Sequence, residues 1–104
     1  MSNTQQPKYR RVILKISGES FSKPGQHGID PQELGAIASE ILEATKCGSQ
    51  VAVVVGGGNI VRGATLAQQG IINQSTADYM GMLATVINGL ALKGALAGLG
   101  QQGR

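Results

Sequence analysis

Two short runs of β-branched residues, each followed by glycine, limit the folds open to this 104-residue chain. Residues 11–17 (RVILKIS) and 50–55 (QVAVVV) are apolar with little alternation, which is typical of parallel strands covered on both faces. Parallel strands need a long crossover connection, and an amphipathic segment lies between the two runs. The sequence therefore predicts a β-α-β unit in an α/β fold.

The crossover helix has clear start and stop signals. Asp30 is the predicted N-cap, Pro31 takes the first helical position, and Glu33 follows as in a capping box. Apolar residues then recur at helical spacing, and Gly48 closes the helix. Residues 18–28, rich in Ser, Gly and Pro, are predicted to form a loop.

A second long helix is predicted from Ser75, with Asp78 as its capping-box partner, to about residue 97. Residues 60–72 are ambiguous between a short helix and a loop. Glycines interrupt the long helix, and two interpretations stay open: they are merely tolerated, or they let another backbone or a ligand approach closely. Two strands and two helices leave sheet edges unpaired and one face poorly covered, so we expect the N-terminal part of a larger α/β domain or a chain that pairs with another.

Composition and charge exclude several classes of protein. Hydrophobic residues make up 41% and charged residues 14%, as in a globular domain. The net charge of +3 comes from the cluster Lys8, Arg10 and Arg11, and no basic stripe follows it, so no nucleic-acid partner is expected. No uninterrupted apolar stretch approaches the roughly 18 to 20 residues of a membrane span, and no signal peptide is recognisable. With a single cysteine, Cys47, these features favour a cytoplasmic protein without a membrane partner.

The strand ends carry the candidate chemistry. Lys15 lies on a strand that is otherwise apolar, so it either reaches water or binds an anion at the carboxyl end of the sheet. Ser17 and Gly18 follow it, and residues 56–58 are three consecutive glycines whose amides are free to face a phosphate. Arg62 would add a cationic donor. The alternative is a pair of plain glycine turns, but two such ends together favour a phosphoryl site.

Three other residues, Asp78, His27 and Cys47, carry side chains that could act in a site. Asp78 near a helix start either caps that helix or accepts hydrogen bonds from ribose hydroxyls, and the sequence leaves both open. His27 has no second ligand at metal spacing, so no metal site is predicted. Cys47 has no activating neighbour and is assigned no catalytic role.

Three motifs together resemble those of a known family: KISGE at 15–19, VVVGGGNIVRG at 53–63 and ADYMGMLATVINGLA at 77–91. They are similar to motifs of bacterial uridylate kinases in the amino-acid kinase superfamily, and the third is the most particular to them. The resemblance implies the N-terminal portion of a three-layer αβα fold with a mainly parallel sheet. Residues 1–8 would be a flexible polar tail and 9–104 the UMP- and phosphate-binding part, with the C-terminal ATP-binding half absent.

The same resemblance implies residue roles. Lys15 would be catalytic, stabilising the transferring phosphoryl group. The UMP-binding residues would be Gly57 and Asp78. The residues on the ATP side would be Lys15, Ile16, Ser17, Gly18, Gly58 and Arg62. A region for allosteric activation by GTP would comprise Lys23, Pro24, Gly25, Gln26, His27 and Gly28.

The implied activity is phosphoryl transfer from ATP, with Mg²⁺, to UMP, giving ADP and UDP in pyrimidine nucleotide biosynthesis. Family members are typically homohexamers, so a homo-oligomer is expected. Because the chain carries only part of such a site, we expect it to be inactive alone. The alternative is a non-catalytic module that binds UMP or packs against other subunits. A dinucleotide-binding module is disfavoured because neither strand end has the required glycine spacing.

Overall fold

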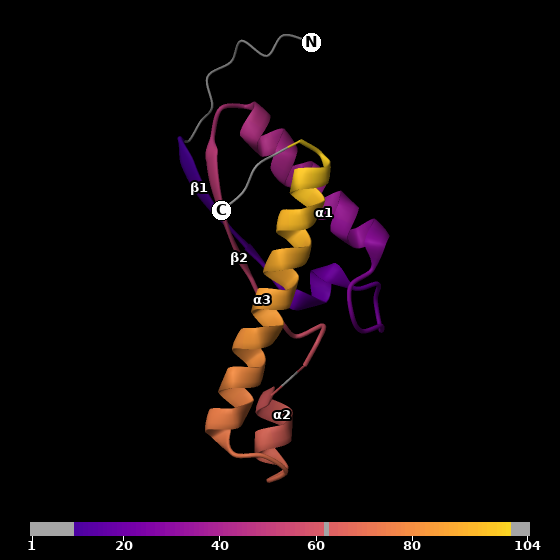
Figure 1. The fold of residues 1–104 in the computed structure, drawn as a ribbon, viewed down its shortest axis with the longest axis vertical. Coiled ribbons are helices and arrows are strands. Elements are labelled where there is room, and N and C mark those ends of the chain that lie inside the picture. Colours follow the sequence, from indigo (N-terminus) through magenta and orange to yellow (C-terminus); the bar gives the residue numbers. More distant parts are fainter. Residues whose placement is uncertain (1–9, 62, 101–104) are drawn as a thin grey trace.

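The two predicted strands form a parallel sheet. The structure is a computed structural model that describes residues 10–61 and 63–100. Strand β1 (Arg11–Ile16) pairs with β2 (Gln50–Val55), with Arg11 opposite Gln50 and Ile16 opposite Val55 (Figure 1). The strands are parallel and in register, so both carboxyl ends lie at the same edge of the sheet. The α/β class is thereby confirmed.

The segment predicted as a loop after β1 is partly helical. It begins with a short 3-10 helix, η1 (Gly18–Phe21), which places the Phe21 side chain in the interior with no exposed surface. The remaining residues turn at Gly25 and Gly28, whose φ angles of 76° and 81° suit glycine. The loop prediction was therefore wrong for its first four residues, because burial of Phe21 stabilises a helical turn there.

Helix α1 (Pro31–Lys46) follows the predicted start signals. The Asp30 carboxylate accepts hydrogen bonds from the backbone N–H groups of Gln32 at 3.0 Å and Glu33 at 3.1 Å. Gly48, with φ of 93°, follows the helix at the turn into β2. Asp30 is thus confirmed as the N-cap and Gly48 as the residue that closes the helix. The capping box is not completed, because the Asp30 N–H donates to the Phe21 carbonyl at 2.7 Å and not to the Glu33 side chain.

Helix α2 (Gly63–Gln68) occupies part of the ambiguous region, and helix α3 (Gln74–Gly98) is the long one. The predicted cap of α3 was wrong. Asn73 is the N-cap, and its side-chain oxygen accepts a hydrogen bond from the Thr76 N–H at 2.8 Å. Asparagine caps as well as serine, and a cap two positions earlier adds two helical residues, so α3 starts at Gln74.

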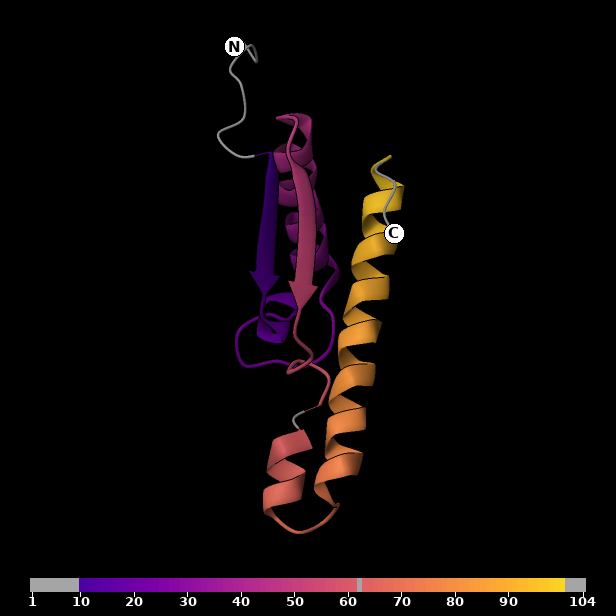
Figure 2. The same ribbon diagram turned by 90° about the vertical axis from the view of Figure 1, so that its left-hand side faces the viewer.

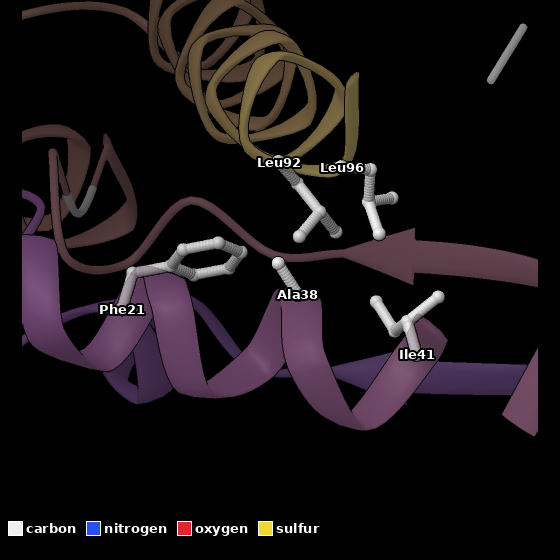
Figure 3. Packing of buried hydrophobic residues seen from close by; sticks show 5 residues of the cluster. All are labelled: Phe21, Ala38, Ile41, Leu92 and Leu96. Carbon is white, nitrogen blue, oxygen red and sulfur yellow. The ribbon is translucent and has the colours of Figure 1, made fainter. Parts of the chain in front are cut away.

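The core lies between α1, α3 and one face of the sheet. Figure 2 shows α1 behind the two strands and α3 beside them, and Figure 3 shows Leu92 and Leu96 of α3 directed toward α1. The buried residues of this cluster are Phe21, Ala38, Ile41, Leu92 and Leu96, and the inward-facing sheet residues packed against them are Ile16, Val51, Val53 and Val55.

The other face of the sheet has no cover from the described residues. Ile13 is 75% exposed and Val54 54% exposed on that face. The prediction that both faces are covered is therefore not met in residues 10–61 and 63–100, because α1 and α3 contribute to the same core. The expectation of one poorly covered face is confirmed.

Helix α3 extends well beyond the sheet. The longest dimension is 57 Å and the radius of gyration 16.1 Å, against about 13 Å for a compact chain of this length. In both ribbon views the first half of α3 lies beside α2, away from the strands (Figures 1 and 2). Apolar side chains between 46% and 66% exposed line its outer face, which we call the α3 stripe: Tyr79, Met82, Leu83, Val86, Ile87 and Leu90.

The stripe makes α3 apolar on two opposite sides. At 100° per residue, the stripe is centred about half a turn from the buried face. That buried face consists of Ala77, Ala84, Asn88, Leu92 and Leu96. By length and composition alone, α3 is long and apolar enough to span a membrane, with a mean hydropathy of 1.4 in its most apolar window, 22% of which is buried. A helix apolar on both sides is normally enclosed on both sides.

Candidate functional site

The glycines after the two strands touch each other. Gly18 is buried, and a Cβ atom built on it would lie 2.8 Å from the Asn59 side-chain oxygen and 2.9 Å from the Gly57 carbonyl carbon, and would overlap the Gly58 nitrogen. The backbone hydrogen bond from the Gly56 N–H to the Ile16 carbonyl, at 2.9 Å, continues the sheet pairing one residue past β2. The parallel register therefore brings together the two glycine-rich ends that the sequence singled out.

Helix α3 forms the next wall of this site. A Cβ atom on Gly57 would lie 2.6 Å from the Ala84 Cβ and 3.0 Å from the Thr85 nitrogen. Glycine on the loop and alanine on the helix thus let two backbones approach closely. The glycines inside α3 play no such part in the described structure, since a Cβ on Gly81, Gly89 or Gly94 meets nothing within 4 Å.

Two buried asparagines fasten the glycine loop, residues 56–59, to α3. The Asn59 and Asn88 side chains are 3% and 0% exposed and bond reciprocally, with N···O distances of 3.1 and 2.6 Å. Asn88 also donates to the Gly56 carbonyl at 2.8 Å. The sequence interpretation assigned no role to Asn88. Its signal was a lone amide on the otherwise apolar buried face of a helix.

Comparison with known proteins shows the family to which the chain belongs. The model of the family described as the amino acid kinase family matches residues 10–104. The chain belongs to the amino acid kinase family. Among curated relatives of this amino acid kinase chain, the uridylate kinase of Xanthomonas axonopodis pv. citri is 53% identical over 96 residues. That of Rubrobacter xylanophilus is 55% identical over 87 residues.

Solved structures give the same result for the amino acid kinase fold. The UMP kinases of Bacillus anthracis and Ureaplasma parvum match with a TM-score of 0.80 each, at 40% and 38% identity. The matches cover 86% and 90% of this chain but 36% and 39% of those structures. The Xanthomonas match covers 92% of this chain and 40% of the relative, and the Rubrobacter match 84% and 34%. The chain thus spans about two fifths of the length of the relatives it matches.

We call the contact between Gly18 and residues 57–58 the glycine contact. The predicted residues of β1 lie at its edge. Lys15 is exposed, opposite Val54, on the sheet face that the described residues leave open. Ile16 is half-buried and ends the strand. Ser17 is exposed, and its hydroxyl lies 3.1 Å from that of Ser20. A lysine and a hydroxyl thus stand at the strand end that leads to buried Gly18.

A groove of about 770 Å³ also runs beside Lys15, between β1, η1 and α1. Its walls include Ser17, Ser20 and Pro24, but also the acidic residues Glu33 and Glu40. Carboxylates beside the groove oppose the binding of a phosphate there, and the glycine loop does not line it. The glycine contact is therefore the better candidate for a phosphate site.

The remaining predicted residues lie farther away or outside the described chain. Asp78 is exposed on the second turn of α3, where its carboxylate accepts a hydrogen bond from the Gln74 side chain at 2.8 Å. It precedes Ala84 by six residues, or about 9 Å along the helix. Arg62 and the polar tail, residues 1–8, lie outside the described residues.

The predicted GTP region, residues 23–28, forms the turn that leads to α1. Lys23 donates to the Gln32 side chain at 2.8 Å and lies 3.9 Å from the Asp30 carboxylate. Its last residue, Gly28, bonds to Asn59: the Gly28 N–H donates to the Asn59 carbonyl at 2.8 Å. This region therefore connects directly with the end of the glycine loop.

Kinases use ATP together with Mg²⁺, so membership of the amino acid kinase family implies that Mg²⁺ takes part in the reaction. In the part of the chain that the structure describes, no three His, Cys, Asp or Glu side chains are close enough to hold a metal ion. The glycine contact offers backbone amides, a lysine and hydroxyls, whereas Mg²⁺ takes anionic and carbonyl oxygens. The described residues therefore do not fit a Mg²⁺ site by themselves, and we assign no step to the ion.

Proposed function

We propose that this chain is the phosphate-holding part of a UMP kinase, the enzyme that converts ATP and UMP to ADP and UDP. The observation that carries the proposal is the contact between Gly18 and residues 57–58. It joins two glycine-bearing strand ends at the carboxyl edge of a parallel sheet, where ligands of open α/β sheets bind. The names of the relatives supply the substrate.

In this proposal each predicted residue has a stated task. Lys15 neutralises charge on the transferring phosphoryl group, and Ser17, Gly18 and Gly58 receive the phosphates of ATP. Gly57 approaches UMP and Asp78 accepts hydrogen bonds from its ribose. Arg62 adds a cationic donor on the ATP side. Mg²⁺ would enter with ATP, and residues 23–28 would respond to GTP.

The proposal also concerns what lies beyond this chain. The relatives are about two and a half times as long as the part matched here, and in this proposal their remaining residues supply the rest of the site. The open sheet face with Ile13 and Val54 is where further elements of such a domain would pack. We therefore expect the 104-residue chain alone to form no UDP. The complete enzyme would serve pyrimidine nucleotide biosynthesis in the cytoplasm.

A second role, packing against other subunits, is favoured by the α3 stripe. Six exposed apolar residues on one helix face would be enclosed if the stripes of two copies met. A membrane is the competing explanation, but a spanning α3 would have to leave its contacts with Gly57, Asn59 and α1 and expose the Asn88 amide to lipid. We therefore propose a homo-oligomer, and the resemblance to uridylate kinases implies a hexamer.

Ligand binding at the glycine contact is the test of this proposal in the chain itself. When UMP or ATP is added, we expect saturable shifts in the amide resonances of Gly18, Gly57 and Gly58 in heteronuclear NMR spectra. Gly35 and Gly94, which lie away from the contact and outside residues 23–28, serve as internal controls and should not move. Equal shifts at all glycines, or none at millimolar nucleotide, would contradict the proposal.

The contribution of Lys15 is tested by Lys15→Ala. Removing a cation that contacts phosphate should weaken nucleotide binding about tenfold, because an exposed charge-assisted hydrogen bond contributes about 1.5 kcal/mol. Lys46→Ala removes an exposed lysine that pairs with Glu43 at 3.8 Å on α1 and should leave binding unchanged. Equal dissociation constants for the two variants would remove Lys15 from the site.

A further inference from the structure

The buried amide pair joins three segments that are distant in sequence. Asn88 belongs to α3, Asn59 ends the glycine loop, and Gly28 ends the segment 23–28. The Asn59 side chain donates both to the Asn88 oxygen at 3.1 Å and to the Gly28 carbonyl at 2.9 Å. The Gly28 N–H donates in turn to the Asn59 carbonyl at 2.8 Å. Asn59 is therefore the residue at which all three segments meet.

Because Asn59 and Asn88 are buried, their hydrogen bonds determine how the glycine loop is placed against α3. Moving an amide out of water is costly unless its donors and acceptor are satisfied, whereas leucine at the same place would gain from burial. Both Asn59 and Asn88 are satisfied, and the described residues contain no buried side-chain polar atom without a partner. An amide pair has fixed donor and acceptor directions, so it specifies one arrangement of loop and helix where apolar contacts would allow several.

The residues next to Asn88 in sequence are exposed, so the buried asparagine pair lies directly beneath the surface of α3. Ile87 and Leu90 belong to the α3 stripe and are 46% and 64% exposed. Asn88 lies between them in sequence but faces inward, where it bonds to the Gly56 carbonyl at 2.8 Å. A displacement of α3 caused by a partner on the stripe would therefore move the hydrogen-bond donor that holds the start of the glycine loop.

We propose that Asn59 and Asn88 are positioning residues that set the conformation of the glycine loop and couple it to both α3 and the segment 23–28. A displacement of α3, or of the segment 23–28, then changes the loop through this pair. The functional meaning rests on the proposed phosphate role of the loop. The coupling itself is a property of the free chain and is measured without nucleotide, so the two proposals can fail separately.

Amide hydrogen exchange of the ligand-free chain tests the positioning role. The reporters are the hydrogen-bonded amides of Gly56 and Ile60, compared with those of Ala38 and Ile41 in the core of α1. In Asn88→Ala, we expect loop exchange to accelerate about tenfold or more relative to the α1 amides, because local opening no longer breaks the amide pair. Unchanged relative exchange would overturn the proposal.

Leu92→Ala is the matched control. It lies one turn after Asn88 on the same buried face and leaves a cavity, so it lowers global stability without removing a hydrogen bond to the loop. It should accelerate loop and α1 amides together. If Asn88→Ala behaves in the same way, the amide pair is merely structural and the proposal is wrong.

Two further variants test the coupling and guard against unfolding. If Asn88→Ala shows no protection in α1, Asn88→Thr replaces it; this variant is uncharged and similar in volume but lacks the amide donor to Gly56, and the same acceleration confined to the loop is expected. The Gly28 amide should also exchange faster in Asn59→Ala and, by a smaller factor, in the Asn88 variant that is used. Acceleration of Gly28 in Asn59→Ala alone would show that the coupling stops at Asn59.

Discussion

Gly18→Ala is expected to unfold a large fraction of the chain. The added Cβ would overlap the Gly58 nitrogen and lie 2.8 Å from the Asn59 side-chain oxygen and 2.9 Å from the Gly57 carbonyl carbon, so it would meet two backbone atoms and one buried side chain of the glycine loop. The loop backbone is anchored by the Gly56 N–H bond to the Ile16 carbonyl and by the buried asparagine pair, so it cannot yield as a flexible side chain does. The expected loss in the free energy of unfolding, from urea denaturation followed by circular dichroism, is about 3 kcal/mol, the upper end for overpacking.

Gly94→Ala is the control for this substitution. A Cβ on Gly94 meets nothing within 4 Å, and the residue lies inside α3, where alanine is favoured over glycine by about 0.5 to 1 kcal/mol. This variant should therefore be slightly more stable than the parent chain. If Gly18→Ala were as stable as Gly94→Ala, the close contact between the two strand ends would not exist in solution.

Charging the α3 stripe is expected to abolish self-association. Leu83→Glu combined with Leu90→Glu places two carboxylates on side chains that are 63% and 64% exposed, so the folded monomer tolerates them. In an interface between two copies, four such charges would be buried without partners, which costs several kcal/mol. Sedimentation velocity should show an oligomer for the parent chain and a monomer for the double variant.

The control for the stripe is Ile71→Glu. Ile71 is 64% exposed but lies outside α3, between α2 and α3, so this variant should sediment like the parent. Identical sedimentation of the parent and the Leu83/Leu90 double variant would contradict the proposed interface. Binding of the parent, but not the double variant, to lipid vesicles without self-association would assign the stripe to a membrane instead.

The parts of the fold that could be predicted are those that local sequence determines. Residues 50–55 form the predicted strand with no change of bounds, because a continuous β-branched run has few alternatives. Asp30 and Pro31 start α1 as expected, since the cap interactions involve residues only two and three positions away. The meeting of Gly18 with the glycine loop followed from the parallel order alone.

The parts that could not be predicted depend on distant contacts. Phe21 lies in a segment whose composition indicates a loop, and only packing against α1 and α3 shows that it belongs to the core. The start of α3 shifted because Asn73 and Ser75 are both good N-caps and sequence does not rank them. Asn88 acquires its role from Asn59, which lies 29 positions earlier. Such pairings are visible only in three dimensions.

The central claim is that this chain supplies the phosphate-holding part of a UMP kinase, and a chimaera tests it most directly. The 96 aligned residues of the Xanthomonas axonopodis uridylate kinase would be replaced by those of this chain, and UDP formation from ATP and UMP measured. We expect activity within about tenfold of the parent enzyme, a loss of about 100-fold or more with Lys15→Ala, and none from the 104-residue chain alone. A folded chimaera that binds ATP but forms no UDP, or UDP formation by the isolated chain, would contradict the account.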